Sequence, residues 1–245
     1  MELIKRFNEI EQTGRAIAGY TCELCGYWTL ERFEGLSDVL YVKSSDLVVA
    51  NQRHTDRVLT VGTEDSGYGV TRPHTKEPFD AMITKDQGLV LCVHTADCVP
   101  IVFLDPVGRA AGIAHSGWVG TAGRIAGKTV RKMAEEFGCR PENILCAMGP
   151  YNHSCCYEVG EDVLERFSET FSDAECAQLF SKKDEPGKYL LDLGRGVSLS
   201  LRKEGVDPEK IYDSGYCTYH TSLFSSWRRS RDKKHQIITY IALTF

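Results

Sequence analysis

Three short apolar runs follow one another in the middle of the chain, and each has the length of a buried β-strand. The runs are Leu89–Val93, Val99–Leu104 and Ala110–Ala114. Runs of this length with turn residues between them are typical of strands that are covered on both faces. The reactive sequence His94-Thr95-Ala96-Asp97-Cys98 separates the first two runs, and the third run ends at His115. A Cys and a His are therefore expected at the ends of neighbouring strands, which is a common position for a functional site.

Strand-like and helix-like segments alternate along the rest of the chain. Apolar residues at helical spacing predict helices over Thr121–Phe137 and over about 161–171 and 192–204. Residues 62–79 and 172–188 are polar and predict connecting loops. Further strands are predicted at Leu3–Phe7, Asp46–Ala50, Val58–Val61, Asp80–Thr84, Ile144–Met148, Tyr189–Leu193, Ile211–Asp213, Gly215–Thr218 and Gln236–Leu243. Because no repeat, low-complexity tract or linker divides the chain, we expect one domain over residues 1–245.

Composition and charge exclude several classes of protein. With 245 residues, of which 42% are hydrophobic, the chain can bury a substantial core. The net charge of −5 offers no basic field for nucleic acid. No apolar run approaches the roughly 20 residues of a membrane helix, and the N-terminus lacks the apolar segment of a signal peptide. Ten cysteines at irregular spacing favour free thiols or metal ligands over a disulfide framework, so we expect a cytoplasmic protein.

Three residues from separate segments could form a metal site. His54 follows a predicted strand, and Cys98 and His115 lie at the strand ends described above. A thiolate and two imidazoles are typical zinc ligands, and three protein ligands leave a position open for water or substrate. Asp97 and Gln52 could orient these ligands from outside. The residues alone leave two alternatives: a Cys98 nucleophile activated by a histidine, and an inert Cys with two hydrogen-bonded histidines.

Two further segments could bind an anion. The glycines Gly117 and Gly120 precede the predicted central helix, and backbone N–H groups at such a start can converge on a phosphate. Arg228 and Arg229 could add positive charge. Alternatively, the glycines form a plain turn without a ligand, and the arginines lie on a solvent-exposed basic face. The lone pair Cys22 and Cys25 lacks a second pair for zinc, so we interpret it as structural thiols.

Four ordered motifs of this chain resemble those of the laccase-domain family, and the resemblance runs from about Val49 to the C-terminus. The motifs are Asn51-Gln52-x-His54, Thr95-Ala96-Asp97-Cys98-x-Pro100, Ala114-His115-x-Gly117-Trp118-x-Gly120, and Gly149-Pro150 followed by Cys156-Tyr157-Glu158-Val159-Gly160. This family was first described as polyphenol-oxidase-like and is now regarded as a family of zinc-dependent purine nucleoside phosphorylases. The resemblance implies an α+β fold in which mixed β-sheets pack as a sandwich with helices on the outer faces.

The resemblance also implies an activity and a set of site residues. Members cleave adenosine, inosine or guanosine with phosphate to a free base and ribose 1-phosphate, and methylthioadenosine phosphorolysis and adenosine deamination are also attributed to them. The implied zinc ligands are His54, Cys98 and His115. We expect Asp97 to serve as acid or base beside Cys98 and His115, with nucleosides and phosphate as the ligands of a monomer or homodimer. The expected phosphate and substrate contacts are Gln52, Gly117, Gly120, Arg228 and Arg229.

The chain departs from the family pattern at Val119, at Thr55, at Phe224-Ser225 before the C-terminal arginines, and in its N-terminal region. Val119 stands where the family usually has Arg or Lys, and Thr55 stands where it usually has Gly. If Val119 and the altered N-terminal region mark lost activity, the chain is a binding module. A cysteine hydrolase or amidase using Cys98 with His115 remains an alternative. A copper-dependent polyphenol oxidase is disfavoured, because three ligands are few for multicopper chemistry.

Overall fold

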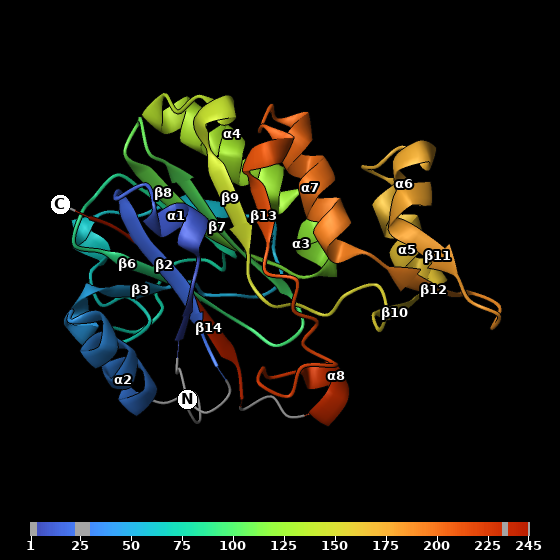
Figure 1. Cartoon of the computed structure of the whole chain (residues 1–245), viewed down its shortest axis with the longest axis horizontal. Coiled ribbons are helices and arrows are strands. Elements are labelled where there is room, and N and C mark those ends of the chain that lie inside the picture. The colour runs from blue at the N-terminus through green and yellow to red at the C-terminus, as the bar shows by residue number, and fades with distance from the viewer. Residues whose placement is uncertain (1–3, 23–29, 232–234, 245) are drawn as a thin grey trace.

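The computed structural model describes residues 4–22, 30–231 and 235–244. Leu3 and Cys25, which belong to two of the sequence predictions, lie outside these ranges. The structure contains a five-stranded sheet and a six-stranded sheet, and a smaller three-stranded sheet lies to one side of them (Figure 1). No helix in the described ranges is long and apolar enough to cross a membrane.

The five-stranded sheet has the order β1-β2-β14-β6-β3. Its strands are β1 (Ile4–Arg6), β2 (Ala16–Thr21), β3 (Leu47–Val49), β6 (Val90–Thr95) and β14 (Ile237–Leu243). The last strand of the chain pairs antiparallel with both β2 and β6, and therefore lies at the centre of this sheet. The edge strand predicted near the N-terminus is confirmed as β1.

The six-stranded sheet has the order β13-β9-β7-β8-β5-β4. Its strands are β4 (Val58–Thr60), β5 (Ala81–Thr84), β7 (Val99–Asp105), β8 (Ala110–Ser116), β9 (Leu145–Met148) and β13 (Ile211–Asp213). The central strands β7 and β8 are buried along their whole length, as expected from their continuous apolar runs.

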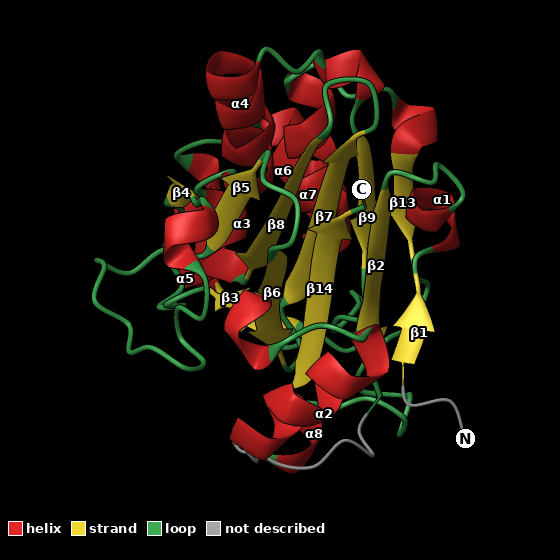
Figure 2. Cartoon of the chain, turned by 90° about the vertical axis from the view of Figure 1, so that its left-hand side faces the viewer, coloured by secondary structure: helices red, strands yellow, loops and turns green. Residues whose placement is uncertain are grey.

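The two large sheets pack face to face and bury one layer of side chains between them. Alternate residues of each strand point to opposite faces, so Val102 faces this layer, whereas Phe103 packs in the separate cluster on the outer face. Leu91 of β6 and Ile113 of β8 meet in the inner layer. In Figure 2, β14 lies in front of β7, as the direct contacts between these two strands require. This arrangement confirms the predicted α+β sandwich of mixed sheets.

Helices cover the outer faces of the sandwich. Helix α4 packs on β5 and β8 beside α7, and residues of α2 share a cluster with β3, β6 and β14 on the opposite side (Figure 1). The helices are α1 (Asn8–Glu11), α2 (Leu30–Leu40), α3 (Trp118–Ala122), α4 (Ile125–Phe137), α5 (Glu161–Ser168), α6 (Asp173–Leu179), α7 (Leu193–Lys203) and α8 (Trp227–Ser230). The small sheet, with the order β10-β12-β11, consists of β10 (Glu158–Gly160), β11 (Phe180–Lys182) and β12 (Lys188–Leu191).

The single helix predicted over Thr121–Phe137 is wrong, because the segment forms the end of α3 and all of α4. Arg124 lies between them in the left-handed conformation, with φ of 56°, which stops a regular helix. Its guanidinium donates hydrogen bonds to the carbonyl of Thr170 and stacks 3.7 Å from the ring centre of Phe171. These long-range contacts stabilise a backbone break that apolar spacing does not show.

Two smaller predictions also require correction. Residues 172–188 are not an irregular connection, since they contain α6 and β11. Helix α6 begins with a capping box in which Ser172 and Glu175 each accept a hydrogen bond from the other's backbone N–H, a start signal visible in the sequence. The strand predicted at Gly215–Thr218 is reduced to an isolated bridge between Cys217 and Tyr151.

Candidate metal and substrate site

The structure brings the three predicted metal ligands together at one end of the sandwich. His54 lies in the loop after β3, Cys98 immediately precedes β7, and His115 is the penultimate residue of β8. One ligand atom from each residue lies within 4.8 Å of the other two. The Cys98 Sγ is 3.9 Å from His54 Nε2, and the two imidazole rings meet edge to face with 4.9 Å between their centres.

Strand register explains why Cys98 and His115 meet. Pro100 of β7 pairs with His115 of β8, so the residues just before β7 lie opposite the residues just after β8. Gly117 is the residue opposite Cys98, and a Cβ atom there would lie 3.0 Å from Cys98 Sγ and 2.8 Å from His54 Cδ2. Gly117 therefore leaves the space in which the three ligands converge.

Asp80, predicted only as the first residue of a strand, organises this site. Its carboxylate is fully buried and lies 2.7 Å from Nδ1 of His115. The same carboxylate accepts hydrogen bonds from the backbone N–H groups of Arg53, His54 and Thr55 and from the Thr55 hydroxyl. These bonds hold the loop at His54, which has a left-handed φ of 60°.

The electrostatics of the site favour an ionised carboxylate and an ionised thiol. Burial acts to raise the pKa of Asp80, but hydrogen bonds from His115 and Thr55 together with the His115 charge lower it to about 2. Burial likewise acts to raise the pKa of the Cys98 thiol. The charge and hydrogen bond of His115, and then those of His54, outweigh burial and lower the Cys98 pKa to about 6. A thiolate is the form of Cys that binds metals and acts as a nucleophile.

The donor set fits a zinc ion. Zinc at about 2.0–2.3 Å from each donor places tetrahedral ligands roughly 3.3–3.8 Å apart, so atoms within 4.8 Å need only a small inward movement. The hydrogen bond between Asp80 and Nδ1 of His115 leaves Nε2 of that ring available to bind the metal. Such carboxylate–histidine pairs are the usual outer support of zinc ligands. The identity of the metal stays a prediction.

A cavity of about 670 Å³ opens beside the three ligands. Its size is in the range of small-molecule sites. Its walls combine aromatic rings, the three candidate ligands and two arginines. The lining residues are Gln52, Arg53, His54, His94, Thr95, Ala96, Asp97, Cys98, His115, Trp118, Tyr157, Trp227, Arg228 and Gln236.

Asp97 and Gln52 line the cavity but are already held by other groups. Asp97 accepts hydrogen bonds of 2.6 Å from the Thr218 hydroxyl and from the backbone N–H of Arg228. The Gln52 side chain makes two hydrogen bonds to the backbone of His94. Both residues therefore position the cavity wall, and the acid–base role expected for Asp97 has less support than a positioning role.

The predicted anion contacts separate into two groups. Arg228 lines the cavity, and its guanidinium lies 5.1 Å from the centre of the Tyr157 ring. Arg229 does not line the cavity, because its guanidinium donates to the carbonyls of Thr218, Tyr219 and Phe224. Arg53, an exposed cation of the cavity wall, was missed, although its position inside the Asn51–His54 motif could have indicated it.

The glycines before the central helices have packing roles. Gly117 faces Cys98 as described, and Gly120 is buried inside α3, where a Cβ would lie 3.2 Å from the Thr55 carbonyl. Neither residue lines the cavity. Because α3 has only five residues, its start offers at most a weak helix dipole. The phosphate site expected at Gly117 and Gly120 therefore gains no support from this geometry.

Comparison with known proteins identifies similar chains. The family model of multi-copper polyphenol oxidoreductase laccases matches residues 30–244. Over 212 residues the chain is 32% identical to purine nucleoside phosphorylase YlmD of Bacillus subtilis (strain 168), covering 86% of this chain and 75% of that protein. It is 34% identical over 192 residues to adenosine deaminase RL5 of an unknown prokaryotic organism, covering 77% and 72%. The solved structure of the hypothetical protein YfiH from Bacillus licheniformis matches with a TM-score of 0.92 at 29% identity, covering 100% and 97%.

Proposed function

Because the chain belongs to the family of multi-copper polyphenol oxidoreductase laccases, as its motifs predicted, we propose that it is a zinc-dependent purine nucleoside phosphorylase. Relatives named purine nucleoside phosphorylase and adenosine deaminase place the chain among enzymes that process purine nucleosides. The proposed reaction splits adenosine, inosine or guanosine with phosphate into the free base and ribose 1-phosphate; methylthioadenosine is a further expected substrate. The observation that carries the proposal is the single cavity shared by the His54–Cys98–His115 group, three aromatic rings and two arginines.

The aromatic residues of the cavity suit a purine base. Trp118, Tyr157 and Trp227 line the cavity, and the Trp227 side chain is 38% exposed. Flat rings offer stacking surfaces for a heterocycle, and such stacking is worth about 1–3 kcal/mol per base. A half-exposed tryptophan can close over a bound base without a large rearrangement of the core.

The two arginines of the cavity suit phosphate. A guanidinium binds a phosphate oxygen pair with two parallel hydrogen bonds. Arg228 is held in position by a hydrogen bond to the Glu158 carbonyl and by its contact with Tyr157. Arg53 lies on the cavity wall next to His54. In phosphorolysis these cations would hold phosphate beneath the anomeric carbon while the bond to the base breaks, so that positioning and charge placement supply most of the catalysis.

His54, Cys98 and His115 would hold the zinc ion. When bound, zinc would act as a Lewis acid that polarises an oxygen of the substrate or of phosphate. Asp80 would keep His115 oriented and would fix the backbone at His54. Asp97 would hold the backbone of Arg228, and so the position of one of the proposed phosphate contacts.

One observation favours a second candidate function, which is a cysteine hydrolase or amidase. Cys98 lies against two imidazoles, and His115 lowers the pKa of its thiol. A nucleophile beside a base that is oriented by a third group, here Asp80, is the arrangement of covalent catalysis. In this case the thiolate, rather than a metal, would be the essential species.

The test is base release from adenosine and inosine by protein of measured metal content, with and without phosphate. The proposal predicts phosphate-dependent release of adenine and hypoxanthine that is lost on chelation and restored by zinc. Restoration by copper alone would reassign the metal, and inosine formed from adenosine without phosphate would indicate deamination at the same site. No turnover by fully zinc-loaded protein would overturn the proposal.

Cys98→Ala separates the two candidates. The phosphorylase proposal expects this variant to lose metal and activity together. A variant that keeps its zinc but loses activity would support the cysteine nucleophile. Cys146→Ala is the matched control, since Cys146 is a buried thiol of β9 outside the cavity and its loss should leave zinc binding unchanged.

A further inference from the structure

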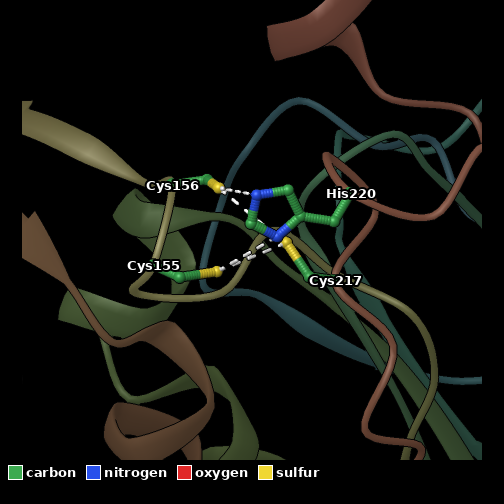
Figure 3. A group of neighbouring side chains, drawn as sticks. All are labelled: Cys155, Cys156, Cys217 and His220. Carbon is green, nitrogen blue, oxygen red and sulfur yellow. Dashed lines mark hydrogen bonds between the residues drawn. The ribbon is translucent and has the colours of Figure 1, made fainter.

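A second cluster of metal-binding side chains lies outside the site described above. Figure 3 shows Cys155 and Cys156, from the loop between β9 and β10, facing Cys217 and His220, from the segment between β13 and α8. One ligand atom from each of the four residues lies within 4.8 Å of the others. The two segments are about sixty residues apart in the sequence. They follow β9 and β13, which pair in parallel in the six-stranded sheet.

The distances within the cluster match a closed set of four ligands. The Cys155 and Cys217 sulfurs are 3.8 Å apart, and the Cys155 sulfur is 3.7 Å from Nδ1 of His220. The Cys156 sulfur lies 3.8 Å from the same nitrogen. Four ligands around one zinc ion are roughly 3.3–3.8 Å from one another. These three distances match the spacing that a tetrahedral ion imposes, and all four ligand atoms lie within 4.8 Å of one another.

Three thiols this close together need a cation if they are to ionise, because neighbouring thiolates repel each other. Cys217 is buried, whereas Cys155 and His220 are exposed. An ion thus has a route from solvent to a partly buried set of ligands.

We propose that Cys155, Cys156, Cys217 and His220 form a second metal site, which binds a structural Zn²⁺ through three thiolates and one imidazole. Four protein ligands leave no open position, which is the pattern of structural zinc. The assignment does not depend on the proposed function, because none of these four residues lines the cavity.

The site would link two segments that build the cavity wall. Tyr157, next to Cys156, lines the cavity, and Thr218, next to Cys217, donates its hydroxyl to Asp97. In the segment of Cys155 and Cys156, the backbone N–H of Asn152 donates to the Asp97 carbonyl. A metal that joins these segments would fix both of the neighbours that hydrogen-bond to Asp97. Binding of zinc at the second site would therefore affect the geometry of the cavity beside His54, Cys98 and His115.

Metal counting tests the assignment. Protein purified with reductant in zinc-containing buffer should hold about two zinc ions per chain, as measured by inductively coupled plasma mass spectrometry. The double variant Cys155→Ser/Cys156→Ser should hold about one. Cys98→Ala should also hold about one, which separates failure of this site from failure of the first. Tyr219→Ala changes an exposed neighbour of His220 and is the control that should keep both ions.

Cobalt substitution gives a readout that is independent of zinc counting. A site with three thiolates should produce much stronger sulfur-to-cobalt absorption than a site with one, and most of this absorption should disappear in Cys155→Ser/Cys156→Ser. His220→Ala, a change at an exposed position, should weaken binding at least tenfold while leaving the protein folded. Equal zinc content in the wild type and the double variant would overturn the proposal, as would a Cys155–Cys217 disulfide in the reduced preparation.

Discussion

Oδ1 of Asp80 lies 2.7 Å from Nδ1 of His115, and the same carboxylate accepts the backbone N–H of His54. One buried side chain therefore positions two of the three predicted metal ligands. The first of these contacts sets the tautomer and the ring orientation of His115, and the second holds a left-handed backbone at His54. The geometry of the site depends on Asp80 as much as on the ligands themselves.

Asp80→Asn should weaken zinc binding. Loss of an outer carboxylate partner of a metal-bound His typically costs about 10–100-fold in affinity, and the amide would also present a donor toward the backbone N–H groups. Competition with a coloured chelator measures the dissociation constant. Asp105→Asn is the matched control, because Asp105 is a buried carboxylate that accepts two backbone N–H groups in a turn away from the site. Unchanged affinity in folded Asp80→Asn protein would contradict the positioning role.

Asp97→Asn should lower kcat by about 10–100-fold while the metal content stays the same, because a hydrogen bond to a charged group is worth roughly 1.5–3 kcal/mol. The carboxylate accepts from Thr218 and from the backbone of Arg228, and an amide can satisfy only one of these donors with its oxygen. The shape of the pH profile of kcat/KM distinguishes the roles of Asp97. If Asp97 is a positioning residue, Asp97→Asn should leave that shape unchanged. Loss of the acidic or the basic limb of the profile in Asp97→Asn would instead identify Asp97 as a general acid or base.

Much of the fold follows from local patterns. The apolar runs of β6, β7 and β8 are buried in the structure, and Cys98 and His115 lie at the ends of β7 and β8 as expected. The break at Arg124 escaped prediction because it depends on contacts with Thr170 and Phe171, more than forty residues away. Helix α6 differs from this case, because its start signal, the Ser172–Glu175 capping box, is local and therefore predictable from the sequence.

The site was less predictable than the fold. Asp80 is 35 residues from His115 in the sequence, and only the pairing of β5 with β8 brings them together. The second cluster joins two pairs of residues about sixty positions apart, and no sequence motif groups His220 with Cys155. Spacing along the chain identifies residue types suited to a metal, but long-range strand pairing decides which of them meet.

Leu91→Ala should destabilise the sandwich. Leu91 is fully buried in the layer between the two large sheets, and replacing such a leucine costs about 2–5 kcal/mol because of lost burial and the cavity left behind. Urea unfolding of the metal-free protein measures the change. Val39→Ala, on an exposed side of α2, should change the free energy of unfolding by only about 0.5 kcal/mol. Similar small effects for both variants would mean that the sheets do not pack tightly at Leu91.

Arg228 and Arg229 are adjacent in the sequence but should respond to mutation in opposite ways. Arg228 lines the cavity, so Arg228→Ala should raise KM for phosphate about tenfold or more through loss of a charge-assisted contact. Arg229 donates to three carbonyls instead. Arg229→Ala should therefore leave the phosphate KM near that of the wild type, while removing about 2 kcal/mol of stability.

The measurements for this pair are phosphate titrations at saturating nucleoside and thermal unfolding. A loss of about 2 kcal/mol corresponds to a fall in Tm of roughly 4–8 °C for a chain of this size, and we expect this fall for Arg229→Ala. Arg228→Ala loses one hydrogen bond, to the Glu158 carbonyl, and should unfold closer to the wild type. If Arg229→Ala raised the phosphate KM and Arg228→Ala did not, the assignment of the two side chains to cavity and scaffold would be reversed. Each variant is the control for the other, since both remove the same charge from neighbouring positions of α8.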